Sequence, residues 1–333
     1  MTSDRIEIEL AGQTLSVSNP DKVFFKKRGE TKLDLIEYYR SVEGPILLAM
    51  GGRPTLLQRF PDGAGGKNFF QKRVPKGAPD WLQTATVSTV NGTTSNAMVV
   101  ADIAHIGWAV QMGVLGFHPW PYVDNPDIAD ELRIDLDPHG VDFNAVREGA
   151  RLTRDLLDEL GIASGVKTSG SKGLHIFVRL LPQWDSYQVR SAAVALAREL
   201  ERRHPELLTW AWWKEERGDR VFVDYNQNCP HKTMFGAWSV RARVGAQVST
   251  PLFWDELATV DPNALTMETV PDRLAKRGDP WAELYKTPQT LEPLLAMSAR
   301  DMDAGMQDAP WPPVYPKQPN EPPRVAPSRA RKA

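Results

Sequence analysis

The sequence is poor in cysteine: Cys229 is the single one among 333 residues. A lone thiol cannot form a disulfide within the chain, and it cannot build a zinc site that needs several cysteines. The sequence therefore predicts a protein of a reducing compartment, and a cytoplasmic location is our expectation.

Long apolar runs are also missing. A membrane-spanning helix needs about 18 or more consecutive apolar residues, and no stretch of this sequence approaches that length. The first ten residues, MTSDRIEIEL, contain neither the basic nor the apolar segment of a secretory signal peptide. We therefore expect no leader peptide and no membrane partner.

An excess of positive charge is absent as well. The 40 lysines and arginines are offset by 42 aspartates and glutamates, which gives a formal net charge of −2. This balance excludes a protein that holds nucleic acid through its overall charge, so any such site must come from locally concentrated basic residues. Charged residues at 25% and hydrophobic residues at 41% are typical of a globular chain.

Helical and strand-like patterns alternate along the chain, which predicts a mixed α/β fold. Thr31 can cap one helix, with Asp34 three positions on as its capping-box partner. Asp142 can cap a second helix, which Gly161 stops. Strand patterns cover residues 132–137, 219–225 and 237–243, and residues 163–180 are predicted to form a strand, a Gly/Ser turn and a second strand. A further helical pattern covers 186–205.

The last part of the chain has a different composition. From about Leu291 the pattern decays into a proline-rich stretch with a basic end, APWPPVYPKQPNEPPRVAPSRARKA. That composition favours an extended or disordered conformation. We therefore divide the chain into a folded domain, residues 1–290, and a C-terminal tail, residues 291–333.

Two aspartates one residue apart give the first sign of chemistry. Asp135 and Asp137 alternate with Ile134 and Leu136 in RIDLDPHG, and on a β-strand this spacing points both carboxylates to one face. Like charges so close repel unless a cation lies between them, and carboxylate oxygens are the ligands that Mg²⁺ and Mn²⁺ prefer. Two surface acids on an exposed strand face are the alternative.

A glycine-rich turn, TSGSKGLHIFV, follows further along the chain. Its Gly-Ser-Lys order and its return into a strand pattern distinguish it from the Walker A loop, in which Gly-Lys-Ser/Thr leads into a helix. A turn with Ser169 and Lys172 can still aim backbone N–H groups, a hydroxyl and an ammonium at an anion. His175 lies in the next strand, and a structural turn with a core histidine is equally compatible with the sequence.

A third aspartate, Asp224, ends the strand pattern VFVD. If it lies beside Asp135 and Asp137, the three carboxylates form a cup that can hold two divalent ions about 3.5–4 Å apart. A lone aspartate in this position is otherwise a cap or a turn former. Lys232 and Arg241 follow, and their charge suits either a polyphosphate or an ordinary solvated strand face.

Two aromatic stretches remain open to more than one interpretation. His118 lies in FHPWPY, where a histidine among aromatic residues is more often packed than a ligand. Phe69 and Phe70 lie in KNFFQKR, a basic, glycine-rich region. Exposed phenylalanines there suggest base stacking, worth about 1–3 kcal/mol per base, whereas anchoring of the loop to the core is the alternative.

In their order, the D-x-D strand, SGSKGLH and VFVD resemble the motifs of the archaeo-eukaryotic primase superfamily. More narrowly, SNPDKVFF, GRP, NFFQK, APDWL, TSGSKGLH and VFVDYNQN resemble the polymerase domain of bacterial ligase D, the end-joining enzyme, over residues 17–285. The resemblance implies an α/β (α+β) fold, a primase-polymerase core whose RRM-like mixed sheet is flanked by helices. Residues 1–290 would form this catalytic domain.

The resemblance also assigns roles to the matching residues. The metal-binding catalytic residues of the family match Asp135, Asp137 and Asp224. The nucleotide-binding positions match His118, Ser169, Lys172, His175, Gln227, Lys232 and Arg241. The pocket for a 5′-phosphate at a DNA break, with the aromatic pair beside the template, matches Asn19, Lys22, Lys32, Phe69 and Phe70. Two ions, Mn²⁺ or Mg²⁺, are the implied cofactors.

The implied function is template-directed nucleotidyl transfer that extends primers and fills short gaps at DNA breaks by two-metal catalysis, with a preference for ribonucleotides. The alternatives are a primer-synthesising primase-polymerase in damage tolerance, a two-metal nuclease, or a non-catalytic module that bridges DNA ends. A full replicative primase is disfavoured because cysteine and histidine zinc clusters are missing from the sequence.

The resemblance further implies partners and a place in the cell. The partners would be primer–template DNA or gapped and broken DNA ends, nucleoside triphosphates, a Ku-type protein and a separate DNA ligase, and the location would be the nucleoid within the cytoplasm. No ligase or nuclease module follows the matched region, so we expect a stand-alone version of the domain.

Overall fold

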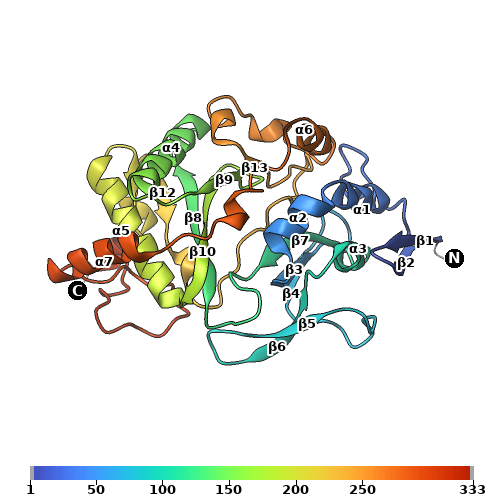
Figure 1. Ribbon diagram of the computed structural model, residues 1–333, viewed down its shortest axis with the longest axis horizontal. Helices are drawn as coiled ribbons and strands as arrows, with labels where there is room; N and C mark the ends of the chain where they lie inside the picture. The colour runs from blue at the N-terminus through green and yellow to red at the C-terminus, as the bar shows by residue number, and fades with distance from the viewer. Residues whose placement is uncertain (1–3, 331–333) are drawn as a thin grey trace. The chain divides into compact units, whose positions relative to one another are not determined.

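The computed structural model describes residues 4–330, and its contacts divide the chain into two compact units (Figure 1). The first unit takes the chain up to Pro126 and adds Lys167–Ser171 and Thr233–Lys286. The second unit comprises Asp127–Val166, Lys172–Lys232 and the chain from Thr287 onward. Because the chain passes between the units several times, neither unit is continuous in sequence, and the C-terminal region belongs to the second unit.

The first unit begins with a two-stranded hairpin beside a small group of helices. Ala11 and Gly12 form its turn with left-handed φ angles of 48° and 75°. The hairpin packs against helix α3, and α3 packs against α1. These elements are β1 (Arg5–Leu10), β2 (Gln13–Ser18), α1 (Lys32–Ser41), α2 (Glu43–Met50) and α3 (Ile103–Gln111).

The sheet of the first unit has the strand order β4-β3-β6-β5, with β7 also paired to β3. Its strands are β3 (Pro54–Arg59), β4 (Phe69–Gln71), β5 (Thr84–Ser88), β6 (Thr94–Val99) and β7 (Val114–Pro119). All the pairs to β3 are antiparallel. The unit is completed by β13 (Pro251–Leu252), α6 (Thr269–Arg277) and the short 3₁₀ turns η3 (Trp254–Glu256), η4 (Pro262–Ala264) and η5 (Leu284–Lys286).

The second unit is built on five successive strands, β11-β12-β8-β10-β9, of a six-stranded mixed sheet. The long central strands β8 and β10 are antiparallel, and so are β12 and β8, whereas β11 and β12 are parallel. The strands are β8 (Ala129–His139), β9 (Gly165–Thr168), β10 (Leu174–Trp184), β11 (Leu208–Thr209) and β12 (Arg220–Asp224). The last two residues of β9 belong to the first unit.

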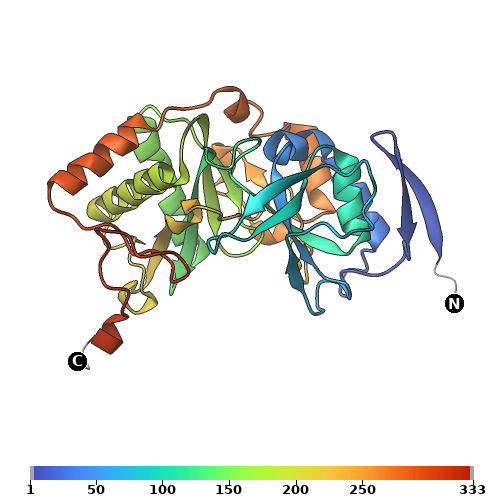
Figure 2. The ribbon, with the colours of Figure 1, turned by 90° about the horizontal axis from the view of Figure 1, so that it is seen from below.

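Helices pack against this sheet, and a further helix packs against one of them. Both α4 and α5 contact β8, and α7 lies alongside α5 (Figures 1 and 2). Ile134 and Leu136 of β8 are almost fully buried, which supplies the apolar face that a helical layer needs. The helices are α4 (Phe143–Glu159), α5 (Ser186–Arg203), α7 (Glu292–Asp303) and α8 (Pro327–Ala330), with the 3₁₀ turns η1 (Lys214–Glu216) and η2 (Asn226–Asn228).

The predicted helix starts are confirmed. The Thr31 hydroxyl accepts a hydrogen bond from the backbone of Asp34, and the Asp34 carboxylate accepts one in return, as a capping box requires. Asp142 caps α4, and Gly161 follows that helix with a φ of 68°. Among residues 4–330, no helix combines the length and the hydropathy that crossing a bilayer demands.

Two local predictions differ from the structure. Residues 237–243 do not form a strand; Val240 makes a single isolated bridge to Val248 instead. The region after Leu291 does not start as an extended tail, because residues 292–303 form helix α7. Leu294 and Met297 are buried, so tertiary packing of an apolar helix face overrides the breaker-rich composition that follows it.

Candidate active site

The two aspartates of RIDLDPHG lie on the central strand of the second unit, as predicted. Asp135 is half-buried and Asp137 is exposed, whereas Ile134 and Leu136 between them are buried. This alternation confirms that both carboxylates share the face opposite the apolar side chains.

Neighbouring strands bring two more side chains to Asp135. Asp224 of β12 lies directly opposite it in the antiparallel register. His175 of β10 lies opposite it on the other side, with Nε2 3.3 Å from the Asp135 carboxylate Oδ1. The sheet therefore assembles two acids and a histidine from three segments that are far apart in sequence.

Asp224 is held by the turn that follows it. Its Oδ1 accepts a hydrogen bond from the backbone N–H of Asn226 at 2.9 Å, and its Oδ2 accepts one from Gln227 Nε2 at 2.7 Å. Burial raises the pKa of Asp224, and the Asp137 charge raises it further, whereas the hydrogen bonds from Gln227 and Asn226 and the charge of Lys232 lower it. The carboxylate is thus aimed and desolvated, a state that a divalent cation would stabilise.

Asp135, Asp137 and Asp224 offer carboxylate oxygens from adjacent strands. Carboxylate oxygens are the type of ligand that a hard divalent ion binds. In the described part of the chain, no three histidine, cysteine, aspartate or glutamate side chains are gathered closely enough to enclose one ion. The register confirms that the three aspartates lie on neighbouring strands, but in the described residues their side chains do not form the predicted three-carboxylate cup.

The second half of the glycine-rich turn also belongs to the second unit. Lys172 is exposed, so its ammonium is available to an anion in solution. A Cβ atom on Gly173 would lie 2.6 Å from the Leu136 carbonyl oxygen, so only glycine permits this close approach to β8. The turn is thereby tied to the strand that carries Asp135 and Asp137.

The first half of the turn belongs to the first unit, where it meets Arg241. Arg241 Nε donates to the Ser169 carbonyl oxygen at 2.8 Å. Gly170 has a left-handed φ of 69°, and a Cβ atom there would lie 2.6 Å from Arg241 Cγ. The glycine is therefore required both by its backbone conformation and by the arginine that packs against it.

His118 of β7 lies in an aromatic cluster of the first unit. Its ring makes edge-to-face contacts with Phe70 at 5.5 Å and Phe235 at 5.1 Å between centroids. The Arg241 guanidinium lies over the Phe235 ring of this cluster, 3.6 Å from its centroid. Burial, together with the charges of Arg241 and Lys167, lowers the pKa of His118 to about 3, so the imidazole is neutral at physiological pH.

Phe69 and Phe70 form most of the short strand β4 and project into solvent, with 47% and 56% of their surfaces exposed. Arg59 of β3 covers the Phe69 ring at 5.2 Å from its centroid. Exposed neighbouring aromatic rings flanked by a guanidinium are suited to stacking on bases. The exposure disfavours the alternative that this pair anchors the loop in the core.

Asn19, Lys22 and Lys32 lie close together at the start of the first unit. Asn19 adopts a left-handed φ of 48°, and its carbonyl oxygen accepts from the Lys22 backbone at 3.1 Å. The Lys32 backbone donates to the Lys22 carbonyl oxygen at 2.9 Å. These contacts join the two lysines, which the sequence separates by a loop, in one small cationic site.

The Lys32 ammonium is buried, where it donates to the Ser18 carbonyl oxygen and, at 3.1 Å, to Gln111 Oε1. The Lys22 ammonium donates to the Pro61 carbonyl oxygen at 2.5 Å. Burial, together with the neighbouring Lys22 charge, lowers the pKa of Lys32 to about 8. A phosphate would relieve this repulsion, which is the property expected of an anion site.

The sequence motifs did not predict a role for two basic residues that lie near these groups. Lys167 of β9 is fully buried, donates to Ser249 Oγ at 2.5 Å and contributes to the low pKa of His118. Arg217, which lies over the Phe222 ring at 3.5 Å, is within electrostatic reach of Asp224 and Asp137. Neither residue stands in a motif, and only its position directly before TSGSKG could have drawn attention to Lys167.

The predicted site residues thus fall into three groups. In the second unit the structure gathers Asp135, Asp224, His175 and Gln227, with Asp137, Lys172 and Lys232 on the same elements or the turns beside them. In the first unit it gathers Ser169 with Arg241, and His118 with Phe70. The third group, also in the first unit, is Asn19, Lys22 and Lys32.

Comparison with known proteins gives a consistent result. The family model of the LigD primase-polymerase domain matches residues 31–281. A multifunctional non-homologous end joining protein LigD from Mycobacterium bovis is 35% identical over 277 residues, which is 80% of this chain and 36% of that protein. A bifunctional non-homologous end joining protein LigD from Bacillus subtilis is 32% identical over 287 residues, 85% of this chain and 46% of that protein.

A solved structure is similar throughout its length. It is the polymerase domain of Mycobacterium tuberculosis ligase D in complex with DNA, with a TM-score of 0.77 and 33% sequence identity, covering 83% of this chain and 99% of that chain. This match confirms the predicted α/β fold. The chain spans 36% and 46% of the lengths of the two curated relatives. The family model, the curated relatives and the solved domain agree, and the chain belongs to the LigD primase-polymerase domain family.

Proposed function

We propose that this chain is a template-directed nucleotidyltransferase that extends a primer at a gapped or broken DNA end. The observation that carries the proposal is the alignment of Asp135 with Asp224 on one side and His175 on the other, in a chain of this family. Aligned acids on a sheet face suit the transfer of a nucleotidyl group to a primer 3′-hydroxyl with release of pyrophosphate.

Two divalent ions, Mn²⁺ or Mg²⁺, would be held by Asp135, Asp137 and Asp224. When bound, they supply charge neutralisation at the α-phosphate and lower the pKa of the primer hydroxyl. Gln227 and the backbone of Asn226 orient Asp224 for this role. We expect the enzyme to prefer Mn²⁺ and ribonucleotides, and this expectation follows from the family resemblance alone.

The basic and polar side chains would bind the nucleoside triphosphate. Lys172 and Lys232 lie in the unit that carries the aspartates and would contact its phosphates. The nucleotide-binding roles of Arg241 and Ser169 are proposed from the family resemblance. His118 is neutral in the free protein, so it would contribute a hydrogen bond rather than a charge. The charged donors act chiefly through preorganised electrostatics.

DNA would be held by the first unit. The solved relative is bound to DNA, and the exposed Phe69 and Phe70 offer a stacking surface for template bases. The Lys22 and Lys32 site would hold a 5′-phosphate. A Ku-type protein and a separate ligase are the partners expected for end joining, within the nucleoid.

The decisive experiment is extension of a labelled primer on a one-nucleotide gap, with ribonucleotides or deoxyribonucleotides and with Mn²⁺ or Mg²⁺. The natural chain should lengthen the primer, and Asp135→Ala with Asp137→Ala should abolish that activity while leaving DNA affinity within about threefold. Asp124→Ala, an exposed acid outside the site, is the matched control and should keep full activity.

Each alternative has its own result in the same assay. A shortened primer would identify a nuclease and overturn the proposal. Product on an unprimed template would indicate primer synthesis rather than gap filling. DNA binding without any change in primer length would indicate a non-catalytic end-bridging module.

A further inference from the structure

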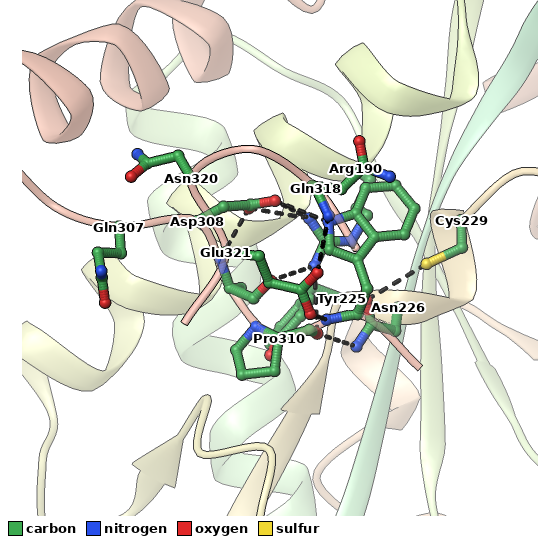
Figure 3. Close-up of polar contacts among 12 residues, drawn as sticks. Arg190, Tyr225, Asn226, Cys229, Gln307, Asp308, Pro310, Gln318, Asn320 and Glu321 are labelled. Atoms are coloured by element: carbon green, nitrogen blue, oxygen red, sulfur yellow. Dashed lines mark hydrogen bonds and ion pairs between the residues drawn. The ribbon is translucent and has the colours of Figure 1, made fainter. Parts of the chain in front are cut away.

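The region after the family match packs against the turn that follows Asp224. The family model ends at residue 281, yet Ala309, Trp311 and Tyr315 are buried in the second unit. Figure 3 shows Asp308, Pro310 and Glu321 gathered beside Arg190 of helix α5 and Asn226 of the turn after Asp224. We call residues 307–324 the C-terminal strap.

Arg190 is the centre of this contact and is 1% exposed. Its Nη1 donates to Asp308 Oδ1 at 3.0 Å, and its Nη2 donates to the Ala309 carbonyl oxygen at 2.9 Å. The guanidinium also lies 3.9 Å from the Trp311 ring centroid. A planar fork that is satisfied by several fixed acceptors and stacked on an aromatic ring is a specific use of arginine.

The same guanidinium reaches the turn that follows Asp224. Its Nε donates to Asn226 Oδ1 at 2.9 Å, and the Tyr225 ring centroid lies 5.4 Å away. The strap contacts that turn as well, because Asn226 Nδ2 donates to the Pro310 carbonyl oxygen at 3.1 Å. Both polar ends of the Asn226 side chain are therefore fixed from outside the turn (Figure 3).

Asn226 in turn contacts the catalytic carboxylate. Its backbone N–H donates to Asp224 Oδ1 at 2.9 Å. One residue thus links the strap and Arg190 on one side to Asp224 on the other, through hydrogen bonds only.

The strap is itself an ordered element. Glu321 is 5% exposed, and its carboxylate accepts from the backbone of Trp311 at 2.7 Å and of Gln318 at 3.1 Å. Trp311 Nε1 donates to Asp308 Oδ2 at 2.7 Å, which fixes the carboxylate that Arg190 binds. The Tyr315 hydroxyl donates to the Pro230 carbonyl oxygen at 2.6 Å.

We propose that Arg190 is a positioning residue that, together with the strap, fixes Asn226 and thereby aims the Asp224 carboxylate at a divalent ion. This inference rests on the proposed function, since it gives Asp224 the role of a metal ligand. It adds a requirement, because the family-matched region alone would not contain the strap.

The test compares Arg190→Lys with the natural chain. Lysine keeps the positive charge but cannot donate to three separate acceptors in a plane. We expect the half-saturating Mn²⁺ concentration for primer extension to rise about tenfold and kcat to fall about tenfold, with KM for the nucleotide and DNA affinity changed by less than threefold. Asp308→Ala, which removes the carboxylate that Arg190 and Trp311 bind, should shift the metal dependence in the same direction by about threefold.

Arg202→Lys is the matched control, because Arg202 lies on the same helix, binds Glu199 and is 67% exposed in its side chain. It should leave the metal dependence unchanged. If Arg190→Lys and Asp308→Ala lower the melting temperature but leave the Mn²⁺ dependence as in the natural chain, Arg190 is a packing residue and the inference is wrong. If Arg190→Lys does not fold, Asp308→Ala decides by the same criterion.

A direct Mn²⁺ titration, followed by electron paramagnetic resonance without nucleotide, separates this inference from the proposed function. If the natural chain binds Mn²⁺ but extends no primer, the proposed function fails, and weaker Mn²⁺ binding by Arg190→Lys would still support the positioning role. Equal Mn²⁺ affinity in both proteins, or no Mn²⁺ binding by the natural chain, would overturn it.

Discussion

Asp224 of β12 and Asp135 of β8 face each other across an antiparallel strand pair in the second unit. Side chains in directly opposed positions lie within about 4.5–5.5 Å at Cβ, and like charges there are destabilising by roughly 0.2–1 kcal/mol. The protein nevertheless has both carboxylates in these positions, and His175 lies beside Asp135. A site that sacrifices stability in this way is typical of function.

The first prediction follows from that repulsion. Asp224→Asn removes one of the two opposed charges, so the free energy of unfolding without metal should rise by about 0.5 kcal/mol, while primer extension should be lost. Thermal unfolding in a chelator measures the first effect and gap filling the second. Asp219→Asn, at an exposed residue just before β12, is the control, and equal changes in the two variants would contradict the prediction.

The second prediction concerns pH and Lys32. Because burial lowers its pKa to about 8, Lys32 loses its proton as the pH rises through that value. The preference for a 5′-phosphate over a 5′-hydroxyl on the downstream strand should therefore fall by about tenfold between pH 7 and pH 9.5. Binding of both DNA ends, measured by fluorescence anisotropy at constant ionic strength, tests this. Equal preference across the range would remove Lys32 from the phosphate site.

The lowered pKa of Lys32 also affects the free energy of unfolding, which should rise with pH, whereas the phosphate preference should fall. Between about pH 8 and the ordinary lysine pKa, the unfolded chain binds the Lys32 proton more readily than the folded one, so this group's contribution to stability increases with pH. Lys32→Met should abolish this pH-dependent increment. Urea unfolding of both proteins at pH 7 and pH 10 measures it.

The third prediction concerns Gly170. Gly170→Ala places a methyl group only 2.6 Å from Arg241 Cγ, on a backbone with φ of 69°. Arg241 should move, and KM for the nucleotide should rise about tenfold. Gly161→Ala is a close control, since Gly161 has a φ of 68° and no atom within 4 Å of the added Cβ. Both variants should lose about 1 kcal/mol of stability from backbone strain, but Gly161→Ala should keep its KM.

The fourth prediction concerns the exposed pair on β4. Phe70 is 56% exposed, so Phe70→Ala should change the melting temperature little. It should weaken binding of a DNA end with an unpaired template base by about 1–3 kcal/mol if the ring stacks on that base. Phe70→Tyr retains the ring and should retain the affinity. A stability loss with unchanged DNA affinity would show that Phe70 serves the core.

Local interactions were readable from the sequence because they depend on near neighbours. The Thr31–Asp34 capping box, the cap at Asp142 and the alternation around Asp135 and Asp137 are each encoded within a few residues, and all appear in the structure. The strand prediction for residues 237–243 was wrong because the chain turns at Trp238, whose φ is 63°.

The sequence by itself determined which chemical groups are present and which strands and turns carry them, because periodicity, caps and motifs act over short distances. Only the tertiary structure decided that Asp224 meets Asp135, that His118 is sealed among aromatic rings, and that the proline-rich end becomes a strap held by Arg190. Strand register and burial are set by contacts between distant segments, and burial is what shifts the pKa values of Asp224, His118 and Lys32.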